Sequence, residues 1–321
     1  MAGVQIATYV LVLIFIVAFA SKIIKYLRMP VHLRWELYPL VGESKRPWGG
    51  SYLEEPEWWT KPREEKSFSG EMKFMGKEIL FFKEYFDRNK SLWRIVYPFH
   101  MGIFLFVGFF VLLLVGALTM EWDVAVSGQS ANVWGKLVYY LTLAVGIAAL
   151  VLGTAGSLGL LARKITDREM SPYTRRIEYV NILLVLAVFL TGLLSWAVVD
   201  STFATAREYV KSLFSFGEIA GVDALIVAHI VLLVLFLAYL PFTNIMHFFA
   251  KFFTYHMVRW DDAPHLRGSN LERKLQPILQ YPVSWSAPHT QSIKIWSDVA
   301  KGDVAVDGVG RRAVTKGDDS E

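Results

Sequence analysis

Residues 223–250, DALIVAHIVLLVLFLAYLPFTNIMHFFA, decide the fold class of this chain. The run is almost wholly apolar and contains no Lys, Arg or Glu. About 20 apolar residues in a helix cross a membrane core of roughly 30 Å. Inside lipid, a helix satisfies every backbone polar group within one segment. The run is therefore predicted to be a transmembrane helix, and two of its residues, His229 and His247, are histidines.

Four further runs of the same kind precede this one, and none shows the strict alternation of a barrel strand. A hydrophobic fraction of 54% agrees with a membrane protein, since soluble domains are usually less apolar. The first run lacks a basic region before it and is interpreted as a retained helix. The fold class is an all-α membrane protein, a five-helix transmembrane bundle whose spans are about 4–26, 96–120, 134–162, 178–200 and 223–250.

The orientation of the bundle follows from Lys and Arg in the connections. These residues are frequent in 22–95, in 163–176 and at the start of the tail, whereas 121–133 holds none. The three basic regions share one side only if the N-terminus is outside and the C-terminus inside (N-out, C-in). The formal net charge of +4 is thus interpreted as a topology signal, not as a sign of nucleic-acid binding.

Two polar regions are predicted to lie on the cytoplasmic side. The long loop 27–95 includes residues 71–90, EMKFMGKEILFFKEYFDRNK, which are typical of an amphipathic helix at the interface. The tail from 258 is polar and holds four prolines, which favours extended chain wrapped around a partner, and its end is predicted to be disordered. The domains expected are 1–257, the membrane domain, and 258–321, the partner-binding tail.

The chain contains no cysteine. This excludes disulfides, cysteine-ligated iron–sulfur clusters and covalently attached c-type haem within the chain itself. Any redox centre must be held by His, Met or another ligand without a thiolate.

Three histidines lie within or beside the spans. His229 and His247 are eighteen residues apart, about five helical turns, so one face of a continuous helix would carry both, roughly 27 Å apart along its axis. His100 begins the second span on the inner side, at the depth of His247. Two histidines at one depth on different helices suit bis-His ligation of a b-type haem. The alternative is that each histidine hydrogen-bonds a neighbouring helix or a lipid headgroup.

A haem also needs space and cations. The second span supplies Gly102, Gly108 and Gly116, which let a flat ring or another helix approach closely. The topology places four cations at the inner edge, where haem propionates would lie: Arg94, Arg175, Arg176 and Lys251.

Five spans with two histidines eighteen residues apart on the last one resemble the gamma subunit of respiratory nitrate reductase. The loop segments MPVHLRWELYP (29–39) and GSYLEE (50–55), together with PFTNIMH (241–247), are similar to the cytochrome b subunits of transmembrane redox complexes of sulfate reducers, of the heterodisulfide reductase-linked type. The resemblance covers roughly residues 1–265.

The resemblance implies specific site residues. His100 and His247 match the ligands of an inner haem, and His229 matches one ligand of an outer haem. The second outer ligand would lie ten residues after His100, where this chain has Phe110, which cannot bind iron. His229 then either binds a haem with an unusual or absent second ligand, or faces a quinone. Met120, the only other soft ligand near the outer end of the second span, lies on the wrong helix face.

Lys136 matches a lysine that lies near the quinol in the family. Its alternative role is a snorkelling anchor beside Trp134 and Tyr139 at the membrane interface.

The function implied is a quinone-linked b-type haem electron-transfer subunit, not a complete enzyme alone, in a bacterial or archaeal cytoplasmic membrane and in anaerobic respiration. One haem b is expected and a second is open, with menaquinone or another quinone as the redox partner in the membrane. A cytoplasmic iron–sulfur subunit is the expected protein partner, and a periplasmic cytochrome c subunit is a further candidate. The alternatives are a haem-free quinone-binding anchor and a transporter, although no carboxylate is evident within the membrane, away from the ends of the spans.

Overall fold

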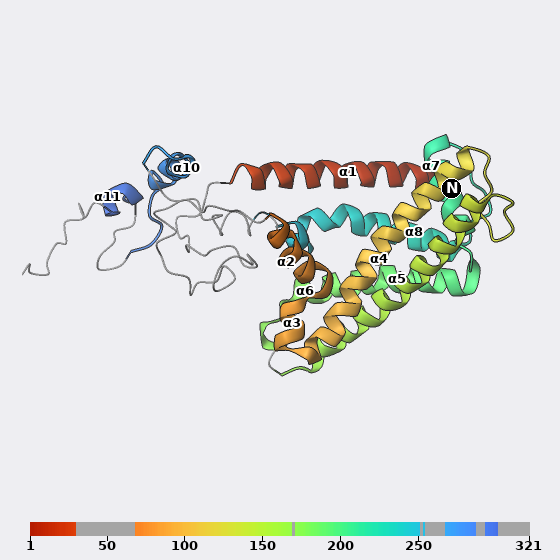
Figure 1. Ribbon diagram of the computed structural model, residues 1–321, viewed down its shortest axis with the longest axis horizontal. Coiled ribbons are helices and arrows are strands. Elements are labelled where there is room, and N and C mark those ends of the chain that lie inside the picture. Colours follow the sequence, from red (N-terminus) through yellow and green to blue (C-terminus); the bar gives the residue numbers. More distant parts are fainter. Residues whose placement is uncertain (30–67, 169–170, 251–252, 254–266, 287–292, 301–321) are drawn as a thin grey trace, which may run out of the picture. The chain divides into compact units, whose positions relative to one another are not determined.

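The computed structural model describes residues 1–29, 68–168, 171–250, 253, 267–286 and 293–300 (Figure 1). The chain divides into two compact units, of which the first comprises Met1–Tyr26 and Met72–Ala250 and the second Leu27–Glu71 and Lys251–Glu321. Much of the second unit lies outside the described residues, so the predicted division at residue 258 stays a prediction.

Five helices of the described residues are long and apolar enough to cross a membrane, which confirms the predicted number of spans. They are α1 (Ala2–Leu27), α4 (Lys90–Glu121), α5 (Val133–Thr166), α6 (Arg176–Leu194) with the π-helical turn η3 (Ser195–Val199), and α8 (Ala224–Tyr239) with the 3₁₀ turn η4 (Leu240–Phe242). A short helix α7 (Ala204–Ser215) lies between η3 and α8.

Polar side chains begin three of these helices by accepting hydrogen bonds from free backbone N–H groups. The side chain of Asn89 accepts from the N–H of Leu92 (3.0 Å), that of Asn132 from Trp134 (2.8 Å) and that of Asp223 from Leu225 (2.8 Å). The second span therefore begins at Lys90, one to two turns before the predicted residue 96.

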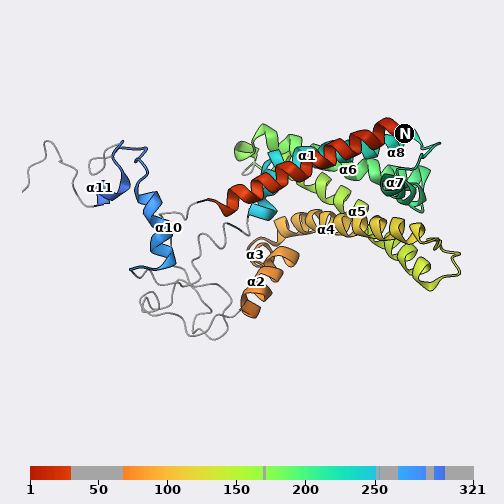
Figure 2. The ribbon, with the colours of Figure 1, turned by 90° about the horizontal axis from the view of Figure 1, so that it is seen from above.

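Helices α4 and α5 form the tightest pair of the bundle and lie side by side (Figure 2). A Cβ atom on Gly102 would lie 2.4 Å from the backbone nitrogen of Gly153, and one on Gly156 would lie 2.4 Å from the backbone of Phe99. Gly102 thus lets another helix approach, not a flat ring, which decides between the two predicted uses of this glycine. Next to this contact, α6 packs its Phe189 ring onto Gly153.

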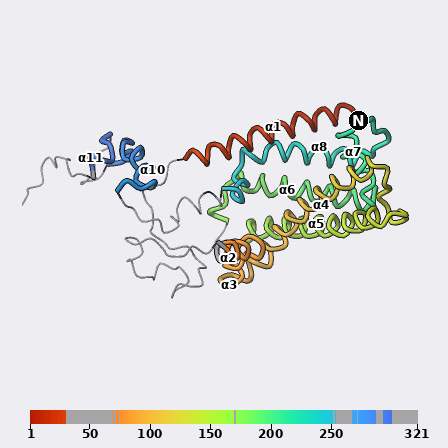
Figure 3. Tube along the Cα trace, turned by 45° about the horizontal axis from the view of Figure 1, so that its top comes forward, coloured from red at the N-terminus to blue at the C-terminus, as the bar shows by residue number. Residues whose placement is uncertain are grey.

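The start of α1 is joined to α7 by polar contacts, and α1 runs beside α8 (Figure 3). Gln5 donates to the hydroxyl of Ser212 (2.9 Å), and the hydroxyls of Thr8 and Tyr209 lie 2.7 Å apart. We call the end of the bundle that holds α7 and the start of α1 the α7 end. The opposite end, where α4 begins, we call the α3 end.

The predicted amphipathic helix over 71–90 is instead two helices, α2 (Phe68–Phe81) and α3 (Lys83–Arg88). Phe82 separates them in a left-handed conformation with φ 50°. Both helices expose large apolar side chains, such as Ile79, Leu80 and Phe86, as an interfacial segment would.

The last span differs from the prediction of one helix over 223–250. Regular helix ends at Tyr239, and the 3₁₀ turns η4 and η5 (Asn244–Met246) follow, separated by the extended residue Thr243. Residues 247–250 are helical again. Pro241 explains the break, since a proline has no N–H for the helix and clashes with the preceding turn. The prediction that one continuous helix face carries both His229 and His247 is therefore wrong.

In the second unit, the described part of the tail is not extended as predicted. Helix α10 (Asn270–Leu279) buries Leu275 and Ile278, and α11 (Trp296–Ala300) follows a bridge between Pro282 and Ile295. The amphipathic spacing of the apolar residues in α10 indicates this helix, although the prolines of the tail favour extended chain. The segment 301–321, predicted to be disordered, lies outside the described residues.

Candidate functional site

His100 lies ten residues into α4, near the α3 end. Its Nδ1 atom is 2.9 Å from the carbonyl oxygen of Val96, one turn earlier. The rings of Phe82 and Phe99 flank the imidazole, with centroids 4.6 Å and 5.0 Å away. A carbonyl oxygen only accepts, so Nδ1 donates the hydrogen and Nε2 keeps a lone pair for a ligand.

His247 follows the break in the last span and is exposed. Its Nδ1 atom lies 3.3 Å from the carbonyl oxygen of Asn244. This is the same arrangement as at His100, and it likewise leaves Nε2 as the electron-pair donor. Metal-binding histidines usually donate their other ring N–H in this way, which fixes the tautomer and the ring orientation.

The structure brings these two imidazoles together from different helices. Their ring centroids are 6.2 Å apart and their planes cross at 79°. Two imidazoles on opposite sides of one iron have centroids about 6 Å apart, since each Fe–N bond is about 2 Å. The described residues contain no group of three or more His, Cys, Asp and Glu that could hold a metal ion. A haem needs only two protein ligands, so this pair fits an axial haem site.

Apolar side chains continue the helix face of His100 along α4. Val107, Val111 and Leu118 are spaced 7, 11 and 18 residues after His100 and are exposed, so they continue its helix face. Helix α4 packs against α5 and α7, and α8 packs against α6; within the described residues α4 and α8 do not pack along each other. The face of α4 that carries His100 is thus left to lipid or to a bound group.

His229 is not part of this pair. Its Nδ1 atom is 3.0 Å from the hydroxyl of Thr191 on α6, and its ring packs onto Gly192 of the same helix. A Cβ atom on Gly192 would lie 2.9 Å from Cε1 of the imidazole. The described part of the chain contains three histidines, and the other two are next to each other, so no described histidine is available as a partner for His229.

A comparison with known protein families matches the part of the chain that holds these histidines. A profile of the nitrate reductase gamma subunit matches residues 85–261, more than half of the chain, a range that includes His100, His229 and His247. The chain belongs to the nitrate reductase gamma subunit family. Members of this family are membrane b-type cytochromes that transfer electrons as subunits of multi-subunit complexes. No curated protein and no solved structure matches the chain, and the nearer resemblance to sulfate-reducer subunits stays a prediction.

Phe110 and Met120 both belong to α4. The Phe110 side chain is exposed on α4, whereas Met120 lies in the last turn of α4, where its carbonyl accepts from Lys211 (3.4 Å). Lys136 lies exposed in the first turn of α5, at the α7 end, two positions after the exposed Trp134.

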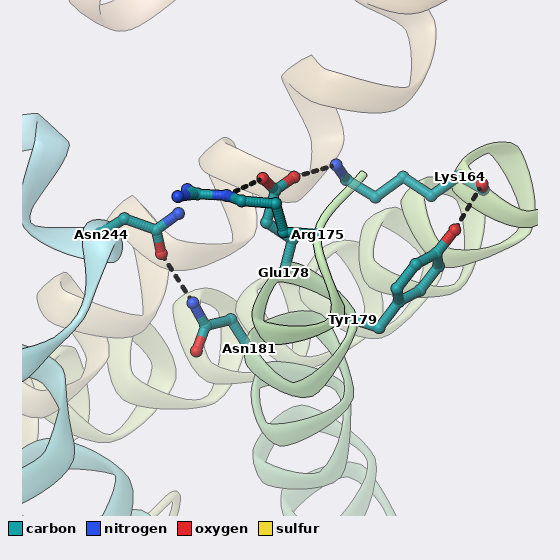
Figure 4. A network of polar contacts seen from close by, with 6 residues as sticks. All are labelled: Lys164, Arg175, Glu178, Tyr179, Asn181 and Asn244. Carbon is teal, nitrogen blue, oxygen red and sulfur yellow. Dashed lines mark hydrogen bonds and ion pairs between the residues drawn. The ribbon is translucent and has the colours of Figure 1, made fainter. Parts of the chain in front are cut away.

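The predicted cations Arg175 and Arg176 lie at the α3 end, where α6 begins. The Arg175 guanidinium donates to Glu178 (3.3 Å), which also accepts from Lys164 at the end of α5 (2.8 Å) (Figure 4). Arg176 is exposed. Arg94 is also exposed and lies six residues before His100, whereas Lys251 lies outside the described residues.

Sequence reasoning missed a polar contact that joins α6 to the broken span. The Asn181 amide donates to the side-chain oxygen of Asn244 (2.7 Å) and accepts from the Tyr239 hydroxyl (3.1 Å). An asparagine within an apolar run is itself a signal, because a polar group inside a membrane needs a partner. Which partner it meets depends on the helix packing and could not be read from the run.

Proposed function

We propose that this chain is a quinone-linked b-type haem electron-transfer subunit of a membrane redox complex, in which His100 and His247 would hold one haem b. The proposal rests on a single observation. Two imidazoles from different helices have centroids 6.2 Å apart, and both Nδ1 atoms face backbone carbonyl oxygens.

Haem b supplies a one-electron iron couple in such a site. The chain contributes the orientation of the ligands, since the carbonyls of Val96 and Asn244 fix both imidazoles with Nε2 free. The apolar face of α4 beyond His100 favours exclusion of water. Arg94, Arg175 and Arg176 at the α3 end are our candidates to pair with propionate groups, since exposed guanidiniums suit carboxylate oxygens.

At the α7 end, we propose that Lys136 and His229 lie beside the quinone headgroup. Quinone chemistry takes up or releases protons, which a titratable side chain next to the headgroup can accept or donate. The exposed position of Lys136 in the first turn of α5 supports access from the membrane interface. The Thr191 hydroxyl, which already donates to the carbonyl of Ala187 (2.7 Å), accepts from Nδ1 of His229 and leaves its Nε2 unprotonated.

The second part of the proposal concerns the partner and the orientation. The chain has no cysteine to hold an iron–sulfur cluster by thiolates, so we propose an iron–sulfur subunit on the cytoplasmic side as electron donor or acceptor. The N-out, C-in orientation in a bacterial or archaeal cytoplasmic membrane would place the α3 end, with the histidine pair, toward that partner. A cytochrome c subunit would dock at the α7 end.

The absorption spectrum of the purified protein tests the haem. We expect a b-type α-band on reduction with dithionite, and loss of that band in His247→Ala. His229→Ala is the matched control and should keep the band. A wild-type protein without haem would favour the haem-free anchor or the transporter instead. Reduction of the haem by a menaquinol analogue then tests the quinone role, and no reduction would exclude it.

A further inference from the structure

The break in the last span leaves His247 on a segment that the helix α8 does not hold. Pro241 removes a backbone hydrogen bond, and Thr243 is extended with φ −112° and ψ 170°. Local bonds shape the turn itself: the Thr243 hydroxyl donates to the carbonyl of Leu240 (2.9 Å) and accepts from the N–H of Ile245 (3.1 Å). These bonds do not reach any other helix, so they do not fix the direction in which the chain continues.

One side chain on α6 bridges this break. Asn181 is 5% exposed, and its carboxamide bonds Tyr239 before the break and Asn244 after it. Figure 4 shows the bond from Asn181 to Asn244. Because Asn181 is buried in the bundle, its two hydrogen bonds hold both sides of the break to α6.

Asn244 also links Asn181 to the imidazole of His247. The same Asn244 that accepts from Asn181 places its backbone carbonyl 3.3 Å from Nδ1 of His247. We propose that Asn181 is a positioning residue for His247, which sets the direction of its imidazole relative to His100. This inference rests on the proposed haem site and extends it to a residue that does not touch the haem.

The bundle gives Asn181 a fixed frame in common with His100. Helix α6 is tied to the end of α5 through Glu178, which accepts from Lys164, and through the Tyr179 hydroxyl, which donates to the Lys164 carbonyl (2.9 Å). Helix α5 in turn touches the backbone of α4 at Gly102. His100 and Asn181 are therefore connected through close contacts between α4, α5 and α6, whereas the break that Asn181 bridges lies between α8 and His247.

The first test replaces Asn181 by leucine in the full-length protein. Asn181→Leu keeps the number of side-chain heavy atoms and removes both hydrogen bonds, so we expect the affinity for haem to fall by about tenfold, as for outer residues that orient metal ligands, and haem per polypeptide to fall with it. The low-spin electron paramagnetic resonance signal of the remaining haem should shift its g values. Tyr239→Phe removes one of the two bonds and should shift the signal less.

The matched control is Thr142→Val on α5. Thr142 is fully buried, and its hydroxyl donates to Val138 of its own helix (2.6 Å), so this variant also removes a buried hydroxyl without touching the break. It should keep the haem content and the g values of the wild type. Asn181→Leu with wild-type haem content and g values would overturn the inference, provided that His247→Ala has lost its haem.

A second measurement does not need the haem. The chain has no cysteine, so Val111→Cys on α4 and Phe248→Cys beside His247, both at exposed positions, accept one spin label each. We expect one narrow distance distribution in the parent and a broader or shifted one with Asn181→Leu, but not with Thr142→Val. An unchanged distribution would refute the positioning role even if the protein proved to bind no haem.

Discussion

Asp200 organises the residues just beyond α6 and η3. Its carboxylate accepts from the N–H and the hydroxyl of Thr202 (3.0 and 2.8 Å) and from the N–H of Thr205 in the first turn of α7 (2.7 Å). Burial alone would raise the pKa of Asp200, but the bonds from Thr202 and Thr205 outweigh burial and hold this pKa below its ordinary value. The carboxylate is therefore more favourable in the folded protein than in the unfolded chain.

We predict that Asp200→Ala lowers the free energy of unfolding by about 1–2 kcal/mol at neutral pH, because the start of α7 loses its acceptor. A lowered folded pKa contributes stability that is complete above the unfolded pKa of about 4 and is lost as the pH falls through the folded pKa. Unfolding in detergent between pH 7 and pH 3 should show this acid loss in the wild type and less of it in Asp200→Ala. The exposed Glu218→Gln is the control, and equal acid profiles for Asp200→Ala and wild type would contradict the assignment.

Arg207, on the same short helix, is 2% exposed. Its guanidinium donates to the carbonyl of Thr202 (3.0 Å) and lies 5.5 Å from the ring centroid of Tyr139. Burial lowers the pKa of Arg207, and the charge of Asp200 partly offsets this effect. The Arg207 side chain packs against Gly116 of α4, a contact that the sequence alone does not show.

At the scale of elements, the contact between α4 and α5 fixes the helix that carries His100. The two backbones approach so closely at Gly102 and Gly153 that a side chain on Gly102 would force the helices apart. Gly108, two turns further along α4, meets only a methyl group of Val145 at 3.9 Å. The same residue type therefore has opposite consequences at these two positions.

We predict that Gly102→Ala destabilises the protein by about 1–3 kcal/mol, as overpacking does. Gly108→Ala should be neutral or stabilising by up to about 1 kcal/mol, because alanine favours the helix and has space there. Thermal unfolding of the two variants in one detergent compares them directly. Equal stability of the two variants would show that the close approach at Gly102 does not carry the helix pair.

The spans could be predicted because long apolar runs have only one stable backbone form in lipid. The ends of the spans are harder to predict than their number. Helix α4, for example, begins after its Asn89 cap, before its apolar run starts. Pro241 in the sequence indicates where the break occurs. That Asn181 bridges the break depends on which helix packs beside it, and the sequence does not show this. The equal depth of His100 and His247 predicts their proximity, whereas the two histidines on the last span do not share one continuous helix face, because the regular helix ends at Tyr239.

At the scale of the whole molecule, the connections of the membrane unit separate into two groups. The connection from α4 to α5 lies at the α7 end and exposes Trp122, while the connection from α5 to α6 lies at the α3 end and exposes Tyr173. The basic residues Arg163, Lys164 and Arg175 accompany the second of these connections. The positive-inside rule therefore predicts that the α3 end faces the cytoplasm and that the α7 end faces the outside.

We predict that Trp122→Cys reacts with a membrane-impermeant maleimide in intact cells, whereas Tyr173→Cys reacts only after the membrane has been opened. The parent chain has no cysteine and serves as the blank. Labelling of Tyr173→Cys but not of Trp122→Cys in intact cells would reverse the orientation and place the histidine pair on the other side of the membrane.

The backbone contact at Gly102 has a consequence for how the distance between the two imidazoles can vary. His100 belongs to a helix that cannot slide or roll without a collision, while His247 follows a joint in the last span. Changes in the gap between the rings must therefore come almost entirely from the His247 side. Natural substitutions that change this distance should therefore occur at the break around Pro241 and at Asn181 on α6. They should not occur at the Gly102 contact.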